Sequence, residues 1–238
     1  MTSAGSRVCV VIPTFNERAN IGFLIKTVSE SKIEGLTVLF VDDSSPDGTA
    51  EEVARVSATA PWVRLMVREK KSGIGSAYRD GFREALSTLD PAVLLEMDAD
   101  MQHPPSLIPR LVEAVEGGAD VAIASRYAPG GSVAGWGLTR RVVSRGANYY
   151  ARVMLGLPVK DATSGFRAYS RRAATRILEP DLPVKGFEFQ VAALKLLKTD
   201  MKIVEIPYQF SARRAGASKL GLKDTVRFFF NVMRIALG

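Results

Sequence analysis

Short, continuous runs of branched apolar residues recur through the first half of the chain. Each run is too short for a helix, and its lack of polar alternation is typical of a strand that is covered on both faces. These runs predict five strands, over residues 8–12, 38–41, 65–67, 93–97 and 121–124.

Between these runs, apolar residues recur at the three- and four-residue spacing of a helix. One stripe lies within residues 21–28, a second within 82–89 and a third within 107–115. Strands that alternate with helices predict an α/β fold, in which helices cover both faces of a mostly parallel central sheet.

The regular alternation stops after Ser125. The segment 127–138 is rich in glycine and contains Trp136, which indicates a functional loop. The pattern beyond this loop predicts a helix over 140–155, a strand over 166–169, a helix over 187–197 and a strand over 203–206.

The C-terminal segment places apolar residues on one helical face and basic residues on another. The apolar face consists of Leu222, Val226, Phe229, Phe230, Met233 and Leu237. An ordinary helix that packs on the domain and a helix that lies on a membrane surface both fit this pattern. We therefore expect a catalytic domain over 1–220 and an amphipathic helix over 221–238.

The composition favours an anionic partner. The chain has 32 Lys and Arg against 25 Asp and Glu, a net charge of +7, which suits phosphate, nucleic acid or an acidic membrane surface. Cys9 is the only cysteine, so no internal disulfide can form. No apolar run reaches the ~18 residues that cross a bilayer, and the start lacks the apolar core of a signal peptide. We expect a cytosolic protein that acts on a membrane, if it does so, from one side.

Two carboxylates follow the fourth predicted strand directly. Asp98 and Asp100 are two residues apart in an extended segment, so both side chains can project toward one cation. Carboxylate oxygens suit Mg²⁺ or Mn²⁺, and Gln102 offers a further oxygen. In the alternative interpretation, Asp100 caps a helix that begins near Pro105 and Asp98 only ends the strand.

The first and second predicted strands also end in polar residues. Asp43 follows the second strand and can accept hydrogen bonds from a nucleobase or ribose. Pro13 is expected to end the first strand, which exposes Phe15 and Glu17 near the same edge. Phe15 can stack on a base, or it can serve as a hydrophobic staple for the following helix.

The segment 70–78 resembles a phosphate loop only superficially. Tyr78 stands where the dinucleotide fingerprint has its third glycine, and no Gly-Lys-Ser/Thr sequence follows. These departures exclude a nicotinamide dehydrogenase and a P-loop enzyme. The glycines are expected to let a helix begin close to the sheet, while Lys70 and Lys71 add positive potential.

Several cations stand at a strand end or in glycine-bearing segments, where a fixed guanidinium can bind a phosphate through two hydrogen bonds. Arg126 follows the fifth predicted strand. The others are Arg140, Arg141, Arg145, Arg213, Arg214 and Lys219. Most surface cations are merely solvated, and these differ from them in their place at a strand end or in a glycine-bearing loop.

His103 is the only histidine, so neither a Ser-His-Asp triad with a conventional nucleophile nor a His/Cys zinc cluster can be assembled. We expect it to be a loop residue beside Asp98. A reaction whose nucleophile is already anionic needs no general base, and a phosphate monoester, with a second pKa near ~6, meets that condition.

The motifs, taken together and in order, resemble the family 2 glycosyltransferases of GT-A fold. They are Val-Ile-Pro-Thr-Phe-Asn-Glu17, Val-Asp-Asp43-Ser-Ser-Pro-Asp-Gly-Thr, Met-Asp98-Ala-Asp100-Met-Gln102 and Ser-Lys219. The resemblance runs nearly end to end and implies a single Rossmann-like GT-A domain. It points to the dolichol-phosphate or polyprenol-phosphate mannose synthases because further motifs also match: Arg-Glu-Lys-Lys-x-Gly-x-Gly75, Ser-Arg126-Tyr, Gly135-Trp136, Ser144-Arg-Gly-Ala-Asn148 and the segment 213–219.

The resemblance also implies roles for individual residues. The nucleotide-sugar-binding residues would be Pro13, Phe15, Glu17, Val41, Asp43, Asp98, Ala99, Asp100, Gln102, Arg126, Arg213 and Lys219. The ligands of Mg²⁺ or Mn²⁺ would be Asp98, Asp100 and Gln102, and the contacts to an acceptor phosphate would be Arg126, Arg140 and Ser144. Asp98, Asp100 and Arg126 are expected to carry catalysis. Phe15 departs from the pattern, since relatives often carry Tyr there, and it keeps the stacking surface without the hydroxyl.

The resulting hypothesis is a peripheral enzyme on the cytoplasmic face of a membrane. It would transfer mannose from GDP-mannose to a polyprenyl monophosphate with inversion, while the loop 127–138 closes over the site.

A polyprenyl-phosphate glucosyl or aminosugar transferase that uses a UDP-sugar is the alternative, since only the base pocket distinguishes the two. A noncatalytic subunit is disfavoured by the intact Asp98, Asp100, Arg126 and Lys219, and a nucleic-acid binder by the lack of aromatics on a basic face. Contact of the C-terminal helix with lipid, with a membrane-anchoring partner subunit or with its own domain stays open.

Overall fold

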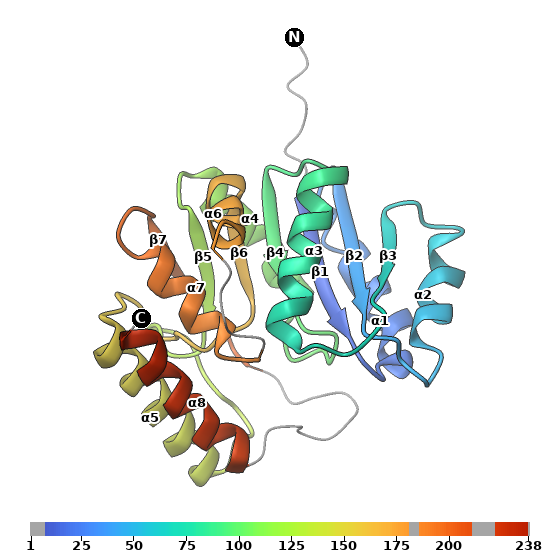
Figure 1. Cartoon of the computed structure of the whole chain (residues 1–238). Coiled ribbons are helices and arrows are strands. Elements are labelled where there is room, and N and C mark those ends of the chain that lie inside the picture. The colour runs from blue at the N-terminus through green and yellow to red at the C-terminus, as the bar shows by residue number, and fades with distance from the viewer. Residues whose placement is uncertain (1–7, 181–185, 211–221, 238) are drawn as a thin grey trace.

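The computed structural model describes residues 8–180, 186–210 and 222–237, with side chains in the last segment from Val226 onward. One seven-stranded sheet forms the centre of the molecule (Figure 1). Its strands are β1 (Val8–Thr14), β2 (Leu36–Asp42), β3 (Val63–Val67), β4 (Val93–Glu96), β5 (Val121–Ser125), β6 (Arg167–Ser170) and β7 (Ile203–Pro207).

The strand order is β3-β2-β1-β4-β6-β5-β7. Neighbouring strands are parallel except around β6, which runs antiparallel to both β4 and β5. The carboxyl ends of all the other strands therefore lie along one edge of the sheet, the lower edge in Figure 1. In open α/β sheets this is the edge where ligands bind.

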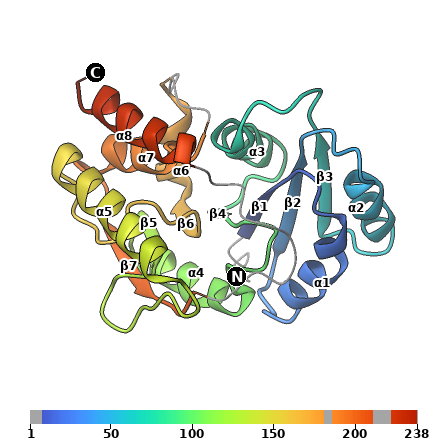
Figure 2. The same ribbon diagram turned by 90° about the horizontal axis from the view of Figure 1, so that it is seen from below.

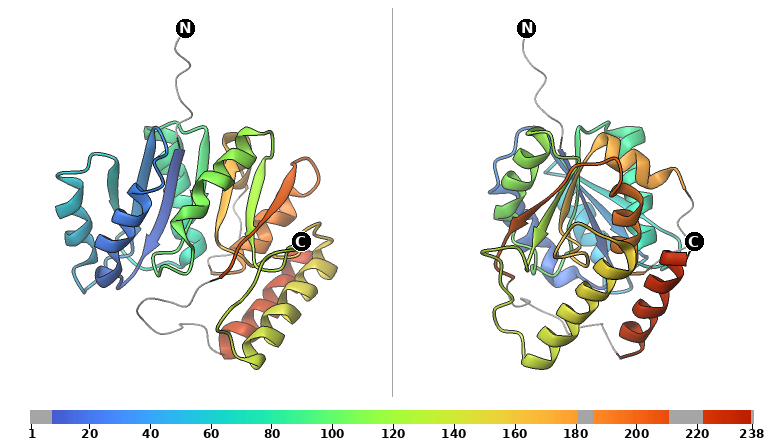
Figure 3. Two further views of the ribbon diagram at one scale, coloured as in Figure 1. Left: turned by 180° about the vertical axis from the view of Figure 1, so that it is seen from behind. Right: turned by 90° about the vertical axis from the view of Figure 1, so that its left-hand side faces the viewer.

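Helices pack on both faces of the sheet (Figures 2 and 3). They are α1 (Arg18–Ser29), α2 (Thr49–Ser57), α3 (Ile74–Thr88), α4 (Ile108–Glu116), α5 (Leu138–Leu155), α6 (Arg171–Leu178), α7 (Phe189–Leu197) and α8 (Leu222–Leu237), and a single 3₁₀ turn spans Pro105–Leu107. The helices α1, α2 and α4 bury their apolar residues with one face of the sheet, and α3, α5, α6, α7 and α8 with the other.

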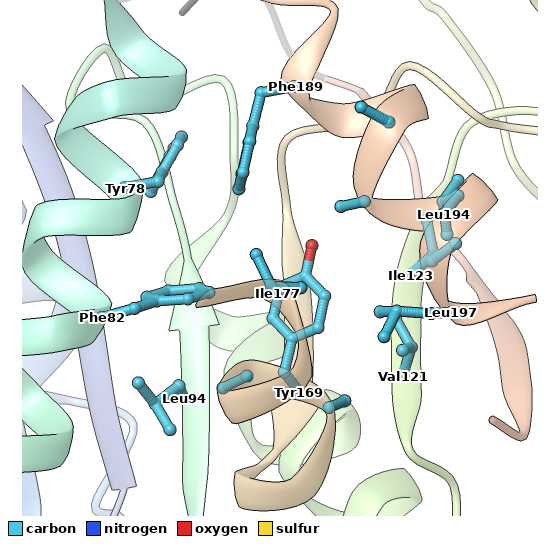
Figure 4. Packing of buried hydrophobic residues seen from close by; sticks show 14 of the residues in the cluster. Tyr78, Phe82, Leu94, Val121, Ile123, Tyr169, Ile177, Phe189, Leu194 and Leu197 are labelled. Carbon is cyan, nitrogen blue, oxygen red and sulfur yellow. The ribbon is translucent and has the colours of Figure 1, made fainter. Parts of the chain in front are cut away.

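The second of these two cores carries aromatic residues close to the ligand edge. Tyr78 of α3 stacks on Phe189 of α7 with ring centroids 6.3 Å apart, and Phe82 meets Tyr169 of β6 edge to face at 5.5 Å (Figure 4). These rings join α3 and α7 across the strands β4 and β6. The helix α3 is thereby held in place beneath the segment that follows β4.

The prediction of an α/β fold with a mostly parallel sheet is confirmed, but two helices were missed. The helix α2 buries only Thr49 and Val53, and α6 docks through the small side chains of Ala173 and Ala174 together with Ile177. Neither presents the long apolar stripe by which a helix is recognised in a sequence. The prediction that Pro13 ends the first strand was also wrong, because β1 runs to Thr14 with Pro13 opposite Val41 of β2.

The helix α8 packs along α5, and the two lie side by side in Figures 1 and 3. Val232 is fully buried, and the ring of Phe229 lies 4.8 Å from that of Tyr150 on α5. Of the predicted apolar face, Phe229 packs against α5, whereas Val226, Phe230, Met233 and Leu237 are exposed. Among the described residues, no helix is both long enough and apolar enough to span a bilayer.

Candidate active site at the carboxyl edge of the sheet

The loop after β4 presents one aspartate outward and turns a second one inward. The Asp98 side chain is 34% exposed, whereas Asp100 is buried. Asp100 Oδ1 accepts a hydrogen bond of 3.0 Å from the backbone N–H of Gln102, across a turn in which Met101 has φ of +65°. No side-chain hydrogen bond caps the 3₁₀ turn that follows, so the alternative role of Asp100 as a helix cap is wrong.

Two side chains hold Asp98 in place. The Tyr78 hydroxyl donates to Asp98 Oδ1 at 3.1 Å, and the Asp98 backbone N–H donates to His103 Nδ1 at 3.0 Å. Burial, together with the charge of Asp98, keeps the pKa of Tyr78 well above its ordinary value, so this hydroxyl remains a donor. The Asp98 carboxylate is thus oriented before any ligand arrives.

His103 lies in the loop beside Asp98, as predicted, and its side chain is buried. Its ring stacks on Phe166, with centroids 5.0 Å apart and an interplanar angle of 13°. Because Nδ1 accepts the Asp98 N–H, the neutral ring carries its proton on Nε2, which lies 3.8 Å from Asp98 Oδ2. The histidine shapes the loop, a role that its sequence position alone did not reveal.

The oxygen atoms of this loop suit a hard divalent cation that is coordinated by the protein and by a substrate together. Among the described residues, no three His, Cys, Asp or Glu side chains converge to form a closed metal cage. Asp98, Asp100 and Gln102 offer only oxygen donors, and one or two carboxylates completed by substrate phosphates and water is the usual arrangement for Mg²⁺. The chemistry of these three residues suits such a cation, and their role as its ligands remains a prediction.

The strands β1 and β2 form a second polar group at the same edge. The Thr14 hydroxyl donates to Asp42 Oδ1 at 2.8 Å, and Ser45 donates to the same carboxylate through its backbone N–H and its hydroxyl. These bonds fix the chain at the point where Asp43 leaves β2. Asp42 is thus a structural residue, and the predicted contact of Asp43 with a nucleotide is compatible with this arrangement.

Asp43 has a cationic neighbour that the sequence did not indicate. Arg68, the first residue after β3, lies with Nη1 at 3.0 Å from Asp43 Oδ1, close enough for an ion pair although not in hydrogen-bond geometry. Burial raises the pKa of Asp43, and the charge of Arg68 offsets part of that rise. Arg68 Nη2 also donates to Ser76 Oγ of α3 at 2.8 Å. The pair joins the ends of β2 and β3 to α3.

Phe15 and Glu17 lie in the loop between β1 and α1. Lys71 Nζ is 3.8 Å from the centroid of the Phe15 ring, a cation–π contact across the mouth of this region. Glu17 Oε2 accepts from Asn20 Nδ2 at 2.8 Å. The structure thus brings Pro13, Phe15, Glu17, Val41 and Asp43 to the carboxyl ends of β1 and β2, and their contact with a nucleotide remains a prediction.

Arg126 at the end of β5 is clamped by Asp161. Asp161 accepts from Arg126 Nε at 2.7 Å, from Nη2 at 2.6 Å and from the backbone N–H at 2.9 Å, and Nη2 also donates to Thr163 Oγ1 at 2.8 Å. Burial lowers the pKa of Arg126, but Asp161 more than compensates and holds it above its ordinary value. Burial likewise raises the pKa of Asp161, and Arg126 outweighs this effect so that the pKa is lowered.

This clamp is tied to the sheet and to α5. Glu205 of β7 accepts from the hydroxyl of Ser125 at 2.7 Å and from the backbone N–H of Asp161 at 2.9 Å. On the other side, Asn148 of α5 donates to Thr163 Oγ1 at 3.0 Å. The orientation of Arg126 is therefore fixed by groups from β5, β7 and α5.

The loop 127–138 carries the remaining predicted contacts. The Tyr127 hydroxyl donates to Ser144 Oγ at 2.7 Å, and the guanidinium of Arg140 stacks on Trp136 at 3.9 Å. Trp136 also lies 5.7 Å from the guanidinium carbon of Arg126. Arg126, Arg140 and Ser144 thus share one aromatic wall, while Arg213 and Lys219 lie outside the described residues.

Sequence reasoning missed Arg68, Asp161, Thr163 and Glu205. A signal existed for Asp161, because Asp161-Ala-Thr-Ser-Gly165 is a polar, glycine-ended segment that leads directly into a strand, as the Asp98 segment leads out of one. For Arg68 the signal is its place immediately after a predicted strand, which is also the position of Arg126. Nothing in its own strand marks Glu205 as a partner of residues 44 and 80 positions away.

Two oriented carboxylates at one strand end and a clamped arginine at another suit a substrate that carries phosphate groups. The comparison with protein families gives the class, because residues 9–178 match the model of glycosyl transferase family 2. The chain therefore belongs to this family.

Within the family, the chain is similar to enzymes that act on lipid phosphates. It is 39% identical to a polyprenol monophosphomannose synthase of Mycolicibacterium smegmatis, over 95% of this chain and 85% of the relative. It is 40% identical to an undecaprenyl-phosphate mannosyltransferase of Micrococcus luteus, over 90% and 87% of the two chains. It is also 36% identical to a dolichol-phosphate mannosyltransferase of Pyrococcus furiosus, over 96% of this chain but 63% of the relative.

Solved structures show the same fold. Glucosyl-3-phosphoglycerate synthase from Mycobacterium tuberculosis, in complex with Mn²⁺ and UDP-glucose, aligns with a TM-score of 0.67 over 98% of this chain and 79% of that chain. The identity is 23%, so the likeness concerns the fold and not the substrate. The GT-A-like architecture that the motifs implied is confirmed.

Proposed function

We propose that the protein transfers mannose from GDP-mannose to a polyprenyl monophosphate, with inversion at the anomeric carbon and release of GDP. The names of three relatives at 36–40% identity support the sugar and the lipid phosphate. The observation that carries the proposal is that the oriented Asp98 and the clamped Arg126 both lie along one edge of the sheet. The first suits the diphosphate of the donor and the second suits the phosphate of the acceptor.

The donor half of the site lies on β1, β2 and the loop after β4. Asp43 would accept hydrogen bonds from the base or ribose, and Phe15 would stack on the base. Asp98, Asp100 and Gln102 would hold Mg²⁺ or Mn²⁺, which neutralises charge on the diphosphate as GDP departs. Tyr78 and His103 keep Asp98 in the orientation that this binding requires.

The acceptor half lies on β5, α5 and the loop between them. Asp161 and Thr163 occupy Nε and Nη2 of Arg126, so Nη1 is the nitrogen of this guanidinium that lacks a partner among the described residues. Arg126, Arg140 and Ser144 would position the acceptor phosphate for in-line attack on the anomeric carbon. A phosphate monoester with a second pKa near ~6 is already a dianion at neutral pH, so the site needs no general base.

Arg213 and Lys219 are proposed as further contacts to the donor phosphates, as their motif implies. We also propose that the protein works as a peripheral enzyme on the cytoplasmic face of the membrane. The exposed apolar residues of α5 and α8 support contact with a lipid surface. The exposed face of α8 also suits a membrane-anchoring partner subunit.

A panel of labelled donors tests this function. The purified protein is incubated with a short-chain polyprenyl phosphate, Mn²⁺ and either GDP-mannose, UDP-glucose or a UDP-aminosugar. We expect label in the lipid fraction from GDP-mannose, at a rate at least about tenfold above that from either UDP-sugar. A preference for a UDP-sugar would replace the assignment with the polyprenyl-phosphate glucosyl or aminosugar transferase.

The Tyr78 hydrogen bond makes a separate prediction. Tyr78→Phe removes a hydrogen bond worth about 1 kcal/mol, so Mn²⁺ should bind about fivefold more weakly to the complex with GDP. Isothermal titration calorimetry measures this affinity directly. Tyr150→Phe is the matched control, because it removes a hydroxyl that donates to the Phe229 carbonyl on α8. Equal affinities of the two variants would contradict the orienting role of Tyr78.

A further inference from the structure

A cavity of about 320 Å³ opens between α5 and the segment around Lys160, and its lining is dominated by cations. Four of its eight lining residues are basic, Arg126, Arg145, Arg152 and Lys160, and the others are Tyr127, Gly131, Asn148 and Tyr149. The cavity therefore adjoins the acceptor half of the site through Arg126 and Tyr127, and it extends from there along α5 to Arg152 and Lys160. We call this cavity the α5 pocket. Arg140 and Ser144, the other predicted contacts to the acceptor phosphate, do not line it.

The charges of the α5 pocket are largely uncompensated. Asp161 neutralises Arg126 and is fully buried by that contact. Glu205, the other acid of this region, accepts from Ser125 and from two backbone N–H groups. The side chains of Arg145, Arg152 and Lys160 are exposed and form no ion pair within the described part of the chain. Three exposed positive charges thus face one small cavity and, even with the carboxylate of Glu205 nearby, create a positive potential that attracts an anion.

The position of the pocket on α5 indicates where such an anion comes from. At 100° per residue, Arg141, Arg145 and Arg152 form one stripe on the helix, and an adjacent stripe carries exposed apolar residues. These apolar residues are Leu138, Val142, Tyr149 and Val153. Tyr149 belongs to both groups, since it lines the pocket and is 69% exposed.

A helix with this surface lies at a lipid boundary, with its apolar stripe among acyl chains and its cations at the level of the phosphates. The helix α5 projects beyond the ligand edge of the sheet in Figure 3, where a flat surface can reach it. An anion in the α5 pocket would then be at headgroup depth.

We propose that the α5 pocket binds the phosphate of an anionic phospholipid, separately from the acceptor, and holds the enzyme at the membrane. Arg145 and Arg152, seven residues apart on α5, bind the phosphate from the helix, and Lys160 binds it from the opposite wall. The site rests on the proposed membrane contact, and it adds a second phosphate site that the transfer reaction itself does not require.

Partition onto vesicles tests the site. Each of Arg145→Gln, Arg152→Gln and Lys160→Gln should weaken binding to vesicles of phosphatidylcholine with phosphatidylglycerol about 30-fold, the equivalent of ~2 kcal/mol, because each loses a hydrogen bond to the phosphate as well as the diffuse attraction to the anionic surface. Arg141→Gln is the matched control, because it removes the same charge from the same stripe, one turn from Arg145 and outside the pocket. It should lose about fivefold, since it affects only the diffuse attraction of ~1 kcal/mol per cation. Equal losses in all four variants would overturn the site.

Two further experiments identify the ligand of the α5 pocket. If inorganic phosphate bound the wild-type protein at low millimolar concentration, and vesicles containing phosphatidylglycerol did not compete, the ligand would be free phosphate and the lipid assignment would be wrong. With a short-chain polyprenyl phosphate in detergent, the three pocket variants should keep KM and kcat within about twofold of the wild type. A raised KM would make the pocket the acceptor's own site. Failure of the proposed function would give a different result. The wild type would transfer no mannose, while the pocket variants would still bind vesicles more weakly than Arg141→Gln.

Discussion

Asp98→Ala should abolish transfer of mannose to polyprenyl phosphate, with a loss of at least about 10³-fold in kcat/KM. Asp98 is the exposed carboxylate of the loop after β4, and two hydrogen bonds orient it toward the ligand edge. Its removal would take away a proposed ligand of the cation that would stabilise charge on the departing GDP, a contribution of several kcal/mol. The measurement is the rate of label transfer from GDP-mannose at saturating Mn²⁺.

Asp200→Ala is the control for this experiment, because it removes an exposed carboxylate whose ion-pair partner among the described residues is Arg172, at 3.9 Å. It should retain the wild-type rate. Calorimetry with Mn²⁺ and GDP should show weak or no metal binding to Asp98→Ala and normal binding to Asp200→Ala. Near-normal transfer by Asp98→Ala in the presence of a chelator would contradict the metal role.

Asp161→Ala should lower the free energy of unfolding by about 3–5 kcal/mol, the loss typical when one partner of a buried ion pair is removed. Asp161 is fully buried and holds the guanidinium of Arg126 by two side-chain bonds of 2.7 and 2.6 Å. Without it, a buried positive charge is left beside Trp136 and Phe210, and its remaining side-chain hydrogen bond within the described part of the chain is to the Thr163 hydroxyl. Urea unfolding measures the change.

The double variant Arg126→Met/Asp161→Ala separates a charge effect from a packing effect. Removing both charges should recover at least about 2 kcal/mol relative to Asp161→Ala, because the unpaired buried cation is gone. Transfer should be lost in both variants, since neither retains an oriented Arg126. A double variant no more stable than Asp161→Ala would show that packing, and not the ion pair, makes Asp161 important.

The parts of this fold that the sequence revealed are those with a strong local pattern. The apolar runs that became β1, β2, β4 and β5 are covered on both faces, so polar residues are excluded from them. The antiparallel direction of β6 could not be foreseen, because strand direction depends on the connection and not on the strand's own residues. The short helix α6 turns the chain around between β6 and α7, and its alanine-rich face gives too weak a periodicity to detect.

The candidate site divides in the same way. Asp98, Asp100 and Arg126 were identifiable because each follows a buried strand, and strand ends meet at one edge of the sheet. Which of the two aspartates faces outward was not predictable, since it depends on the turn at Met101. Asp161 becomes the partner of Arg126, and Glu205 accepts from the backbone of Asp161, only when the loop after α5 and the strand β7 come together around β5. These contacts exist only in the folded chain and cannot be inferred from any one segment.

The most direct test of the account is the anomeric configuration of the mannose in the lipid product, determined by NMR after reaction with Mn²⁺ and again with chelator in excess. Direct attack of the lipid phosphate on the donor, stabilised by a cation at Asp98 and Asp100, predicts a β-mannosyl phosphate that forms with Mn²⁺ and disappears with chelator. An α-linked product, or an undiminished yield in chelator, would contradict it.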